Sequence, residues 1–266
     1  QHSASETPDF LRRLLPRARA VTALPLLVRA DSGFDSAAIF VALSAARAAG
    51  PVDWLVKWNP RRFNVAALYQ RLDADPATAW TQPRVGKRET WLVEPLTRKF
   101  AGTTVTMRRV LHLIERTIDR DGQILLLPDI EIEGWLTSLE LPVAQIVALY
   151  QAHGTHEQFH SEFKTDLELE RLPSGKFATN DLVLSLAVLA FNILRAIGQA
   201  TLIDPDDSPH RHPAKRRRLR TVMQEIIGVA ARVIAHARRL TLGLGQRCAA
   251  FSVFERHYQT LLQFSG

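Results

Sequence analysis

Cysteine is nearly absent from this chain, and its scarcity removes several classes of protein from consideration. Cys248 is the only cysteine, so the chain cannot close an internal disulfide or gather the thiolates of a zinc-cysteine site. The longest hydrophobic run, Leu182–Leu194, is interrupted by Ser185 and Asn192 and falls short of the roughly 20 residues that span a bilayer. We therefore expect a protein of a reducing, cytoplasmic compartment, in which this run forms a buried helix.

The first residues, QHSASETPDF, lack a basic region followed by an apolar one, and they also lack an initiator methionine. The first feature is the one that defines a secretory signal peptide, so we expect none here. The missing methionine indicates that the chain begins partway into a longer protein.

The charge balance favours a polyanionic partner. The 34 Lys and Arg residues outnumber the 27 Asp and Glu residues, for a formal charge of +7 and a pI of about 10.1. Nucleic acid is the first candidate and a membrane surface the weaker one. The hydrophobic content of 46% over 266 residues predicts a folded protein with a substantial core, in one large or two small domains.

The beginning of the chain has the pattern of a strand–helix–strand unit. The apolar run Leu24–Ala30 ends at Asp31-Ser32-Gly33, which is typical of a buried strand followed by a turn. Asp35 or Ser36 can cap a helix over 37–49, and 52–58 forms the next strand. Such strands pair in parallel, and ligands bind beyond their carboxyl ends. Asp31 lies at that edge.

The rest of the chain divides by periodicity. We expect a β-rich, antiparallel insertion over 61–140, in which Asp129 and Glu131 lie on an exposed strand face. The five tryptophans of the chain are expected to be packing residues. Helices are predicted near 8–20, 141–164, 180–200, 221–240 and 251–263, with an exposed linker over 204–220. These patterns divide the chain into four parts: the strand–helix–strand part over 1–60, the β-rich insertion over 61–140, a helical part over 141–203, and the basic linker with the last helices over 204–266.

One predicted helix carries a polar stripe suited to phosphodiester chemistry. At about 100° per residue, Tyr150, His153, Glu157 and Lys164 fall within an arc of about 60°. Ala152, Phe159 and Phe163 lie on the opposite, packing side. A glutamate can hold a divalent cation while a lysine holds a phosphate. Two such ions can activate the attacking oxygen and stabilise the leaving one. Their other carboxylate ligands would come from elsewhere, and Asp31 is suitable.

The spacing Tyr150-x2-His153-x3-Glu157-x6-Lys164 resembles the Tyr-Arg-Glu-Lys signature of insertion-sequence transposases with a DDE catalytic domain, with His153 in place of arginine. The segment LLVRADSGFDS is similar to the strand that bears the second catalytic aspartate. LERLPSGKFATN and LAVLAFNILR resemble the family's segments downstream of the signature helix, and RLRTVMQEIIGVAARVIAHARRL extends the likeness.

The resemblance implies an α/β, ribonuclease H-like catalytic core with a β-rich insertion, a helical C-terminal part and the first strands of the core missing. It implies metal-dependent DNA cleavage and strand transfer at mobile-element ends, with Asp31 and Glu157 as catalytic acids and ligands of two Mg²⁺ or Mn²⁺ ions. Tyr150, His153, Lys164 and Lys176 would contact DNA. The implied partners are double-stranded terminal inverted repeats and target DNA, bound by a homodimer at the bacterial nucleoid, with no membrane.

The first acid of the family should lie on a strand upstream of Asp31, where this chain has room only for QHSASETPDF and one helix. Asp9 precedes a helix, so we do not assign it that role. We therefore expect an inactive fragment. The alternatives are a non-catalytic DNA-binding remnant of a decayed transposase and another nuclease on the same fold.

Several residues also have purely structural interpretations. Asp31 can cap a turn, and a glutamate such as Glu157 on a helix is usually solvated. His156, His160 and Glu162 are expected on a solvated face. In the run Lys215–Arg218, Arg216 and Arg217 either contact DNA phosphates or belong to a soluble linker.

Overall fold

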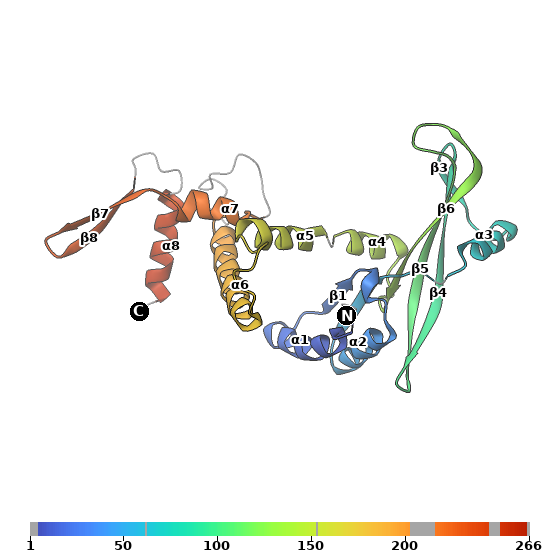
Figure 1. Cartoon of the computed structure of the whole chain (residues 1–266), viewed down its shortest axis with the longest axis horizontal. Coiled ribbons are helices and arrows are strands. Elements are labelled where there is room, and N and C mark those ends of the chain that lie inside the picture. Colours follow the sequence, from blue (N-terminus) through green and yellow to red (C-terminus); the bar gives the residue numbers. More distant parts are fainter. Residues whose placement is uncertain (1–4, 62, 153, 203–215, 245–250, 265–266) are drawn as a thin grey trace. The chain divides into compact units, whose positions relative to one another are not determined.

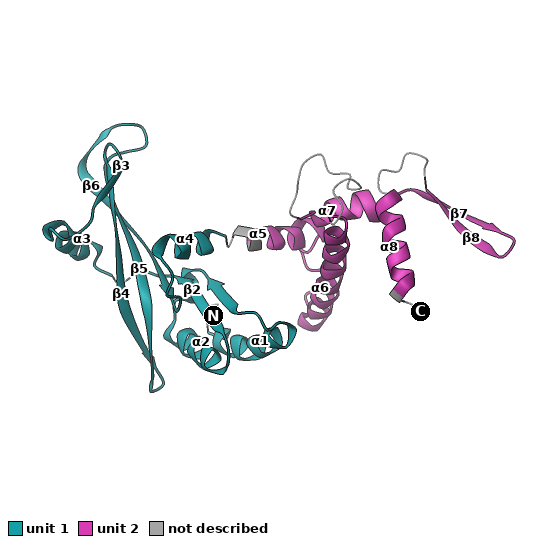
Figure 2. Cartoon of the chain, turned by 180° about the vertical axis from the view of Figure 1, so that it is seen from behind, with its two compact units in different colours: residues 1–153 teal, residues 154–266 magenta. Residues whose placement is uncertain are grey.

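The computed structural model describes residues 5–61, 63–152, 154–202, 216–244 and 251–264. Its elements are labelled in Figure 1. The chain divides into two compact units, Gln1–His153 and Gly154–Gly266, which are coloured separately in Figure 2. Each unit is described by itself.

Unit 1 opens with the predicted strand–helix–strand unit. Helix α1 covers Thr7–Val21, β1 covers Leu26–Ala30, and a short 3-10 turn, Ser32–Phe34, leads to α2, Ala37–Ala49. Strand β2, Val52–Lys57, pairs with β1 in parallel, with Ala30 opposite Val56. The parallel pair confirms the prediction and places the residues that follow both strands at one edge of the sheet.

The β-rich segment continues this sheet rather than forming a separate one. Strands β3 (Thr81–Arg84), β4 (Lys87–Phe100), β5 (Thr103–Ile118) and β6 (Ile124–Thr137) pair antiparallel, as predicted. Strand β6 also pairs antiparallel with β2, so the six strands run in the order β1-β2-β6-β5-β4-β3. Helix α3, Val65–Ala74, precedes these strands and was not predicted. The architecture is mixed α/β, with β1 at one edge of the sheet.

Helices cover both faces of the six-stranded sheet. On one face the buried core joins α1, α2 and α3 to the sheet through Leu15, Phe40, Leu68 and Trp54. On the other face Ile146 of α4, Val143–Gln151, packs among Leu55, Val110 and Trp135. Helix α4 is thereby held beside the carboxyl-terminal end of β1 and β2.

The single helix expected over 141–164 is divided. After α4, helix α5 covers Gly154–Ser161 and a π-helical turn covers Glu162–Asp166. The predicted packing side is confirmed for Phe159 and Phe163, whose rings lie 6.0 Å and 4.4 Å from the ring of Phe191. It is wrong for Ala152, which is exposed after α4 ends. His153 lies outside the described residues.

Helix α6 is longer and more exposed than predicted. It covers Phe177–Ala200, and among its described residues only Gly198 is buried. It is long and apolar enough to cross a membrane by length and composition alone, with 6% of its most apolar window buried. The expectation of a buried helix is therefore wrong for the chain by itself, because the elements of unit 2 pack against only part of its surface.

The prediction of a helix over 221–240 is also wrong. Helix α7 covers Leu219–Val222 and a π-helical turn covers Met223–Ile227, after which β7 (Ala231–His236) and β8 (Arg239–Leu244) form an antiparallel hairpin. The physical reason is that apolar residues here also recur at every second position, at Leu240, Leu242 and Leu244, which suits a strand. The last predicted helix is confirmed as α8, Phe251–Phe264.

Candidate active-site residues

Asp31 follows the last residue of β1 and begins the 3-10 turn. Its Oδ1 accepts a hydrogen bond from the backbone N–H of Gly33 at 2.8 Å. A Cβ at position 33 would lie 3.0 Å from that oxygen, so glycine leaves room for the carboxylate. The side chain is exposed, and Oδ2 makes no hydrogen bond to a described residue. Asp31 thus caps the turn and keeps one oxygen available.

Lys57, the last residue of β2, lies at the same edge. The parallel register sets Ala30 opposite Val56, so Asp31 leaves the sheet at the level where Lys57, still paired with Trp135 of β6, ends β2. The Nζ atom of Lys57 lies 3.1 Å from Oε1 of Glu133 on β6 and 4.2 Å from the ring centre of Trp135. Sequence reasoning missed Lys57, although its place at the end of the second strand was the available signal.

Tyr150 lies in the same environment as Asp31. Its ring packs edge-on against Trp135 with centroids 6.2 Å apart, and Lys57 Nζ lies 5.7 Å from its centre. Burial raises the pKa of the Tyr150 hydroxyl, and the negative charges of Asp31 and Glu133 raise it further. Arg29 Nη1 donates a hydrogen bond to the carbonyl oxygen of Leu149 at 2.7 Å. Two of the residues selected from the sequence, Asp31 and Tyr150, therefore lie on neighbouring segments of unit 1.

Asp35 does not cap α2. The N-cap residue of this helix is Ser36, which makes no side-chain capping hydrogen bond. Oδ2 of Asp35 instead accepts the N–H of Asn59 at 3.0 Å, and Oδ1 accepts from Arg98 at 3.3 Å. The side chain ties the loop after β1 to the loop after β2 and to β4, which steadies the edge that carries Asp31.

Glu157 lies in the first turn of α5 and is exposed. It lines a cavity of about 540 Å³ in unit 2 with Gln158, Ser161, Glu162, Arg216 and Arg218. Its carboxylate makes no hydrogen bond or ion pair with a described residue. Both sequence-selected acids are therefore exposed carboxylates with an oxygen available to a ligand.

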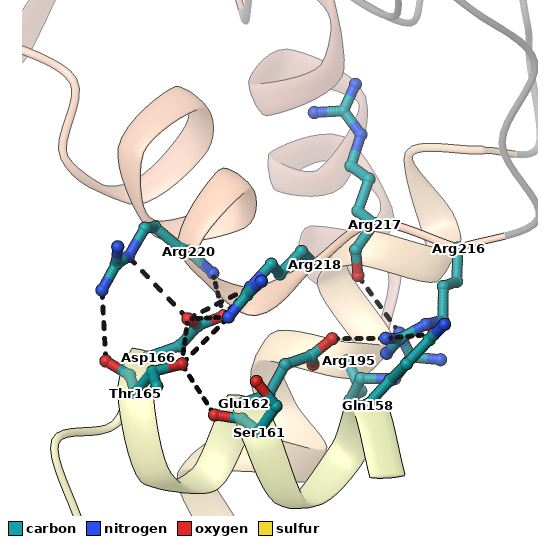
Figure 3. A network of polar contacts seen from close by, with 10 residues as sticks. All are labelled: Gln158, Ser161, Glu162, Thr165, Asp166, Arg195, Arg216, Arg217, Arg218 and Arg220. Atoms are coloured by element: carbon teal, nitrogen blue, oxygen red, sulfur yellow. Dashed lines mark hydrogen bonds and ion pairs between the residues drawn. The ribbon is translucent and has the colours of Figure 1, made fainter. Parts of the chain in front are cut away.

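Glu162 contradicts the expectation of a solvated face. Its side chain is 1% exposed, and its Oε1 lies 2.6 Å from Arg216 Nη2. The same guanidinium donates to Gln158 Oε1 at 2.9 Å and lies over the ring of Phe159. The reason is the π-helical turn, which directs both Glu162 and Asp166 toward the segment that begins at Arg216 (Figure 3).

Asp166 is the centre of a second cluster in this network. Its side chain has no exposed surface, and it accepts hydrogen bonds from Arg218 Nε at 2.8 Å and from the backbone N–H of Arg220 at 3.2 Å. Burial alone would raise the pKa of Asp166. The hydrogen bonds from Arg218 and Arg220 outweigh burial and hold the pKa below its usual range.

Arg217 is also internal. Its side chain is 0% exposed and its Nη1 lies 2.9 Å from Glu225 Oε2. Three arginines of the predicted linker, Arg216 to Arg218, thus face acids of their own unit, with side chains labelled in Figure 3. The prediction of a linker is wrong for 216–220; residues 203–215 lie outside the described part.

Lys164 and Lys176 remain at the surface of unit 2. Lys164 lines a shallow cavity of about 440 Å³ with Thr165, Glu168, Glu170 and Arg171. Lys176 precedes α6 as its N-cap residue. Both side chains are exposed, so their ammonium groups are open to a partner of unit 2. No group of three or more His, Cys, Asp or Glu gathers among the residues that the structure describes.

The chain matches the family of transposase DDE domains of group 1 over residues 1–265. Because the match covers nearly the whole chain, the chain belongs to this family of transposases. The resemblance indicated by the signature spacing is confirmed at this level. DDE transposases act on DNA and generally use divalent metal ions. A search of curated proteins finds no match to the chain.

Proposed function

We propose that this chain supplies two catalytic acids, Asp31 and Glu157, for metal-dependent cleavage and strand transfer of DNA at the ends of a mobile element. The observation that carries the proposal is the position of Asp31. It follows a parallel strand, has an oxygen free of hydrogen bonds to described residues, and shares its surroundings with Tyr150. In open α/β sheets ligands bind outside the carboxyl ends of strands. A ribonuclease H-like core is the fold that fits this placement.

The two acids fit a hard divalent cation. Mg²⁺ and Mn²⁺ prefer carboxylate oxygens, and Asp31 and Glu157 each expose one. When bound, two such ions stabilise the attacking and leaving oxygens of a phosphodiester displacement. Lys57, beside Asp31, is a further positive group at this edge and is suited to hold a DNA phosphate.

DNA would contact residues of both units. Lys164 and Lys176 present ammonium groups at the surface of unit 2, and in unit 1 the half-buried Tyr150 lies close enough to Asp31 to be affected by its charge. We leave Arg217 out of the proposed interface because its side chain has no exposed surface. Arg216 lines the cavity of Glu157 and is partly exposed, so we keep it in the proposed DNA interface. A homodimer that pairs two DNA ends in the bacterial cytoplasm is part of the proposal.

A third carboxylate is needed, and we propose that it enters along the free edge of β1. Strand β1 ends the strand order, so its outer side pairs with no strand among the described residues. A strand added there parallel to β1 would end beside Asp31. Without it, the chain would bind DNA but not cut it.

The test is cleavage of DNA that carries the element ends, with Mg²⁺ or Mn²⁺. This chain is compared with a version extended upstream, each as wild type, Asp31→Asn and Glu157→Gln. The control is Glu255→Gln, which removes an exposed carboxylate of unit 2 on α8. We expect the extended wild type and control to cut and both acid variants to lose at least about 100-fold in rate.

The other outcomes decide between the alternatives. If the extended wild type binds but does not cut, the chain is a DNA-binding remnant. Cutting that survives Glu157→Gln excludes Glu157 from the active site. Cutting without preference for element ends, and without strand transfer, identifies another nuclease.

A further inference from the structure

The hairpin β7–β8 has two chemically different faces. The register pairs Ala231 with Leu244, Val233 with Leu242 and Ala235 with Leu240, so one face is wholly apolar. The pairs on the other face are Arg232 with Gly243, Ile234 with Thr241 and His236 with Arg239. Successive side chains of a strand alternate between faces. The hairpin is therefore a ribbon with a basic side and an apolar side.

The positive charges on the basic side of the hairpin are not neutralised by acidic side chains among the described residues. Arg232, Arg238 and Arg239 are all exposed, and none forms an ion pair with a described residue. The segment 231–244 contains no Asp or Glu. Ala237 and Arg238 have φ values of 48° and 64°, which form a tight turn and place Arg238 at its tip. The positive groups thus extend along one face and around the end of the ribbon.

These arginines differ from those preceding α7. Arg216, Arg217 and Arg218 pair with Glu162, Glu225 and Asp166 inside unit 2. Arg220 also approaches Asp166, at 3.8 Å. The basic run that is most prominent in the sequence is therefore largely neutralised by the fold. The hairpin, which was predicted as helix, keeps its charge exposed.

We propose that the β7–β8 hairpin is a DNA-binding ribbon that sets Arg232, Arg238 and Arg239 against backbone phosphates. A two-stranded ribbon fits the major groove of B-DNA, and arginine suits phosphate oxygens because its planar fork donates two hydrogen bonds. We assign duplex DNA as the ligand of the ribbon because its exposed charges are all positive and the phosphates of the DNA backbone are negative. This inference rests on the proposed function, since it assigns a surface to the same DNA partner.

The experiment is a salt series of DNA binding with the full chain. Each neutralised phosphate contributes about −0.9 to the slope of log K against log salt. The variant Arg232→Ala/Arg239→Ala should make the slope less negative by about 1.8 for element-end and random duplexes alike. Arg232→Lys/Arg239→Lys should keep most of the slope. The matched control is Arg17→Ala/Arg120→Ala, which removes two exposed arginines of unit 1 that lack ion pairs to described residues.

Each outcome decides the question. A wild-type slope in the hairpin variant overturns the inference while leaving the proposed function intact, and so does an equal loss in the control. If Leu240→Asp/Leu242→Asp disperses a dimer in sedimentation while the arginine variant binds DNA normally, the ribbon joins two copies instead. If the wild-type chain binds no DNA at low salt, the inference and the DNA-binding part of the proposed function fail together.

Discussion

Arg218 Nε lies 2.8 Å from Oδ2 of Asp166, a carboxylate with no exposed surface that lies 52 residues earlier in the chain. The contact joins the π-helical turn after α5 to the start of α7. Two hydrogen-bond donors from the later segment, the Arg218 side chain and the Arg220 backbone, converge on one carboxylate. Asp166 is thus an anchor between segments on either side of α6.

Asp166→Ala should destabilise unit 2. The substitution removes a buried carboxylate that is the acceptor of both donors, while the half-exposed Arg218 can turn to water, so we expect the free energy of unfolding to fall by about 1–3 kcal/mol. Urea denaturation of the full chain measures the change, and hydrogen exchange of the α7 amides localises it. Arg220→Ala, whose side chain is 56% exposed, should cost under about 1 kcal/mol. Equal stability of Asp166→Ala and wild type would contradict the anchor.

Arg217→Ala should affect folding without affecting DNA. Its fully buried side chain fills space beside Glu225, and its loss should cost about 2–4 kcal/mol through packing and the broken ion pair. The salt slope of DNA binding should stay that of the wild type, because the guanidinium has no exposed surface. Thermal unfolding and the binding series together test this, and a slope reduced by about 0.9 would show a phosphate contact after all.

Gly134→Ala should destabilise unit 1 through a steric clash in the sheet. A Cβ at position 134 would lie 2.8 Å from side-chain atoms of both Leu111 and Trp58, and 3.2 Å from the carbonyl oxygen of Val110. We expect a loss of about 1–3 kcal/mol because the surrounding strands must shift. Gly102→Ala is the comparison, since no atom lies within 4 Å there; its φ of 82° still strains the backbone. A smaller loss of stability in Gly134→Ala than in Gly102→Ala would contradict the close packing of Trp58 against position 134.

His112 should make unit 1 less stable as the pH falls below about 6.5. Burial lowers the pKa of this imidazole and outweighs the opposite effect of the nearby Glu89 and Glu133 charges. The folded state then binds the proton more weakly than the unfolded state, so its contribution is full above the unfolded pKa and declines as the pH drops toward the folded one. Unfolding curves between about pH 7.5 and 5 should show a smaller decline in His112→Gln than in wild type. Parallel declines would refute the assignment.

Local patterns were sufficient for much of unit 1. The strand before Asp31, the turn at Gly33 and the antiparallel strands each depend on residues close together in the sequence. The structure confirms all three. Helix α3 was missed although its signals were local: Asn64 caps its first turn, and the buried Leu68 and Leu72 are four residues apart. The union of the β-rich segment with the first sheet depends on the pairing of β2 with β6, which no local pattern encodes.

Unit 2 departs further from prediction because long-range ion pairs decide its structure. Glu162 looked like a solvated helix residue and Arg216 like a linker residue, yet the two form an ion pair across a long stretch of chain, with the carboxylate almost fully buried. The segment 231–244 satisfies both helical and alternating patterns, and the strand pattern prevails. The roles of Asp31 and Glu157 stay predictions, since the acids belong to different units.

The most direct test of the central claim asks whether Asp31 and Glu157 each bind a divalent metal ion. Fe²⁺ substituted for Mg²⁺ in the complex of the chain with element-end DNA, in the presence of ascorbate and peroxide, generates radicals that cut the polypeptide near the ion. Peptide mapping should locate cuts around residue 31 and around residue 157, with Asp31→Asn weakening the first and Glu157→Gln the second. Cuts at only one of the two positions, or cuts that persist in both variants, would contradict metal binding by both acids.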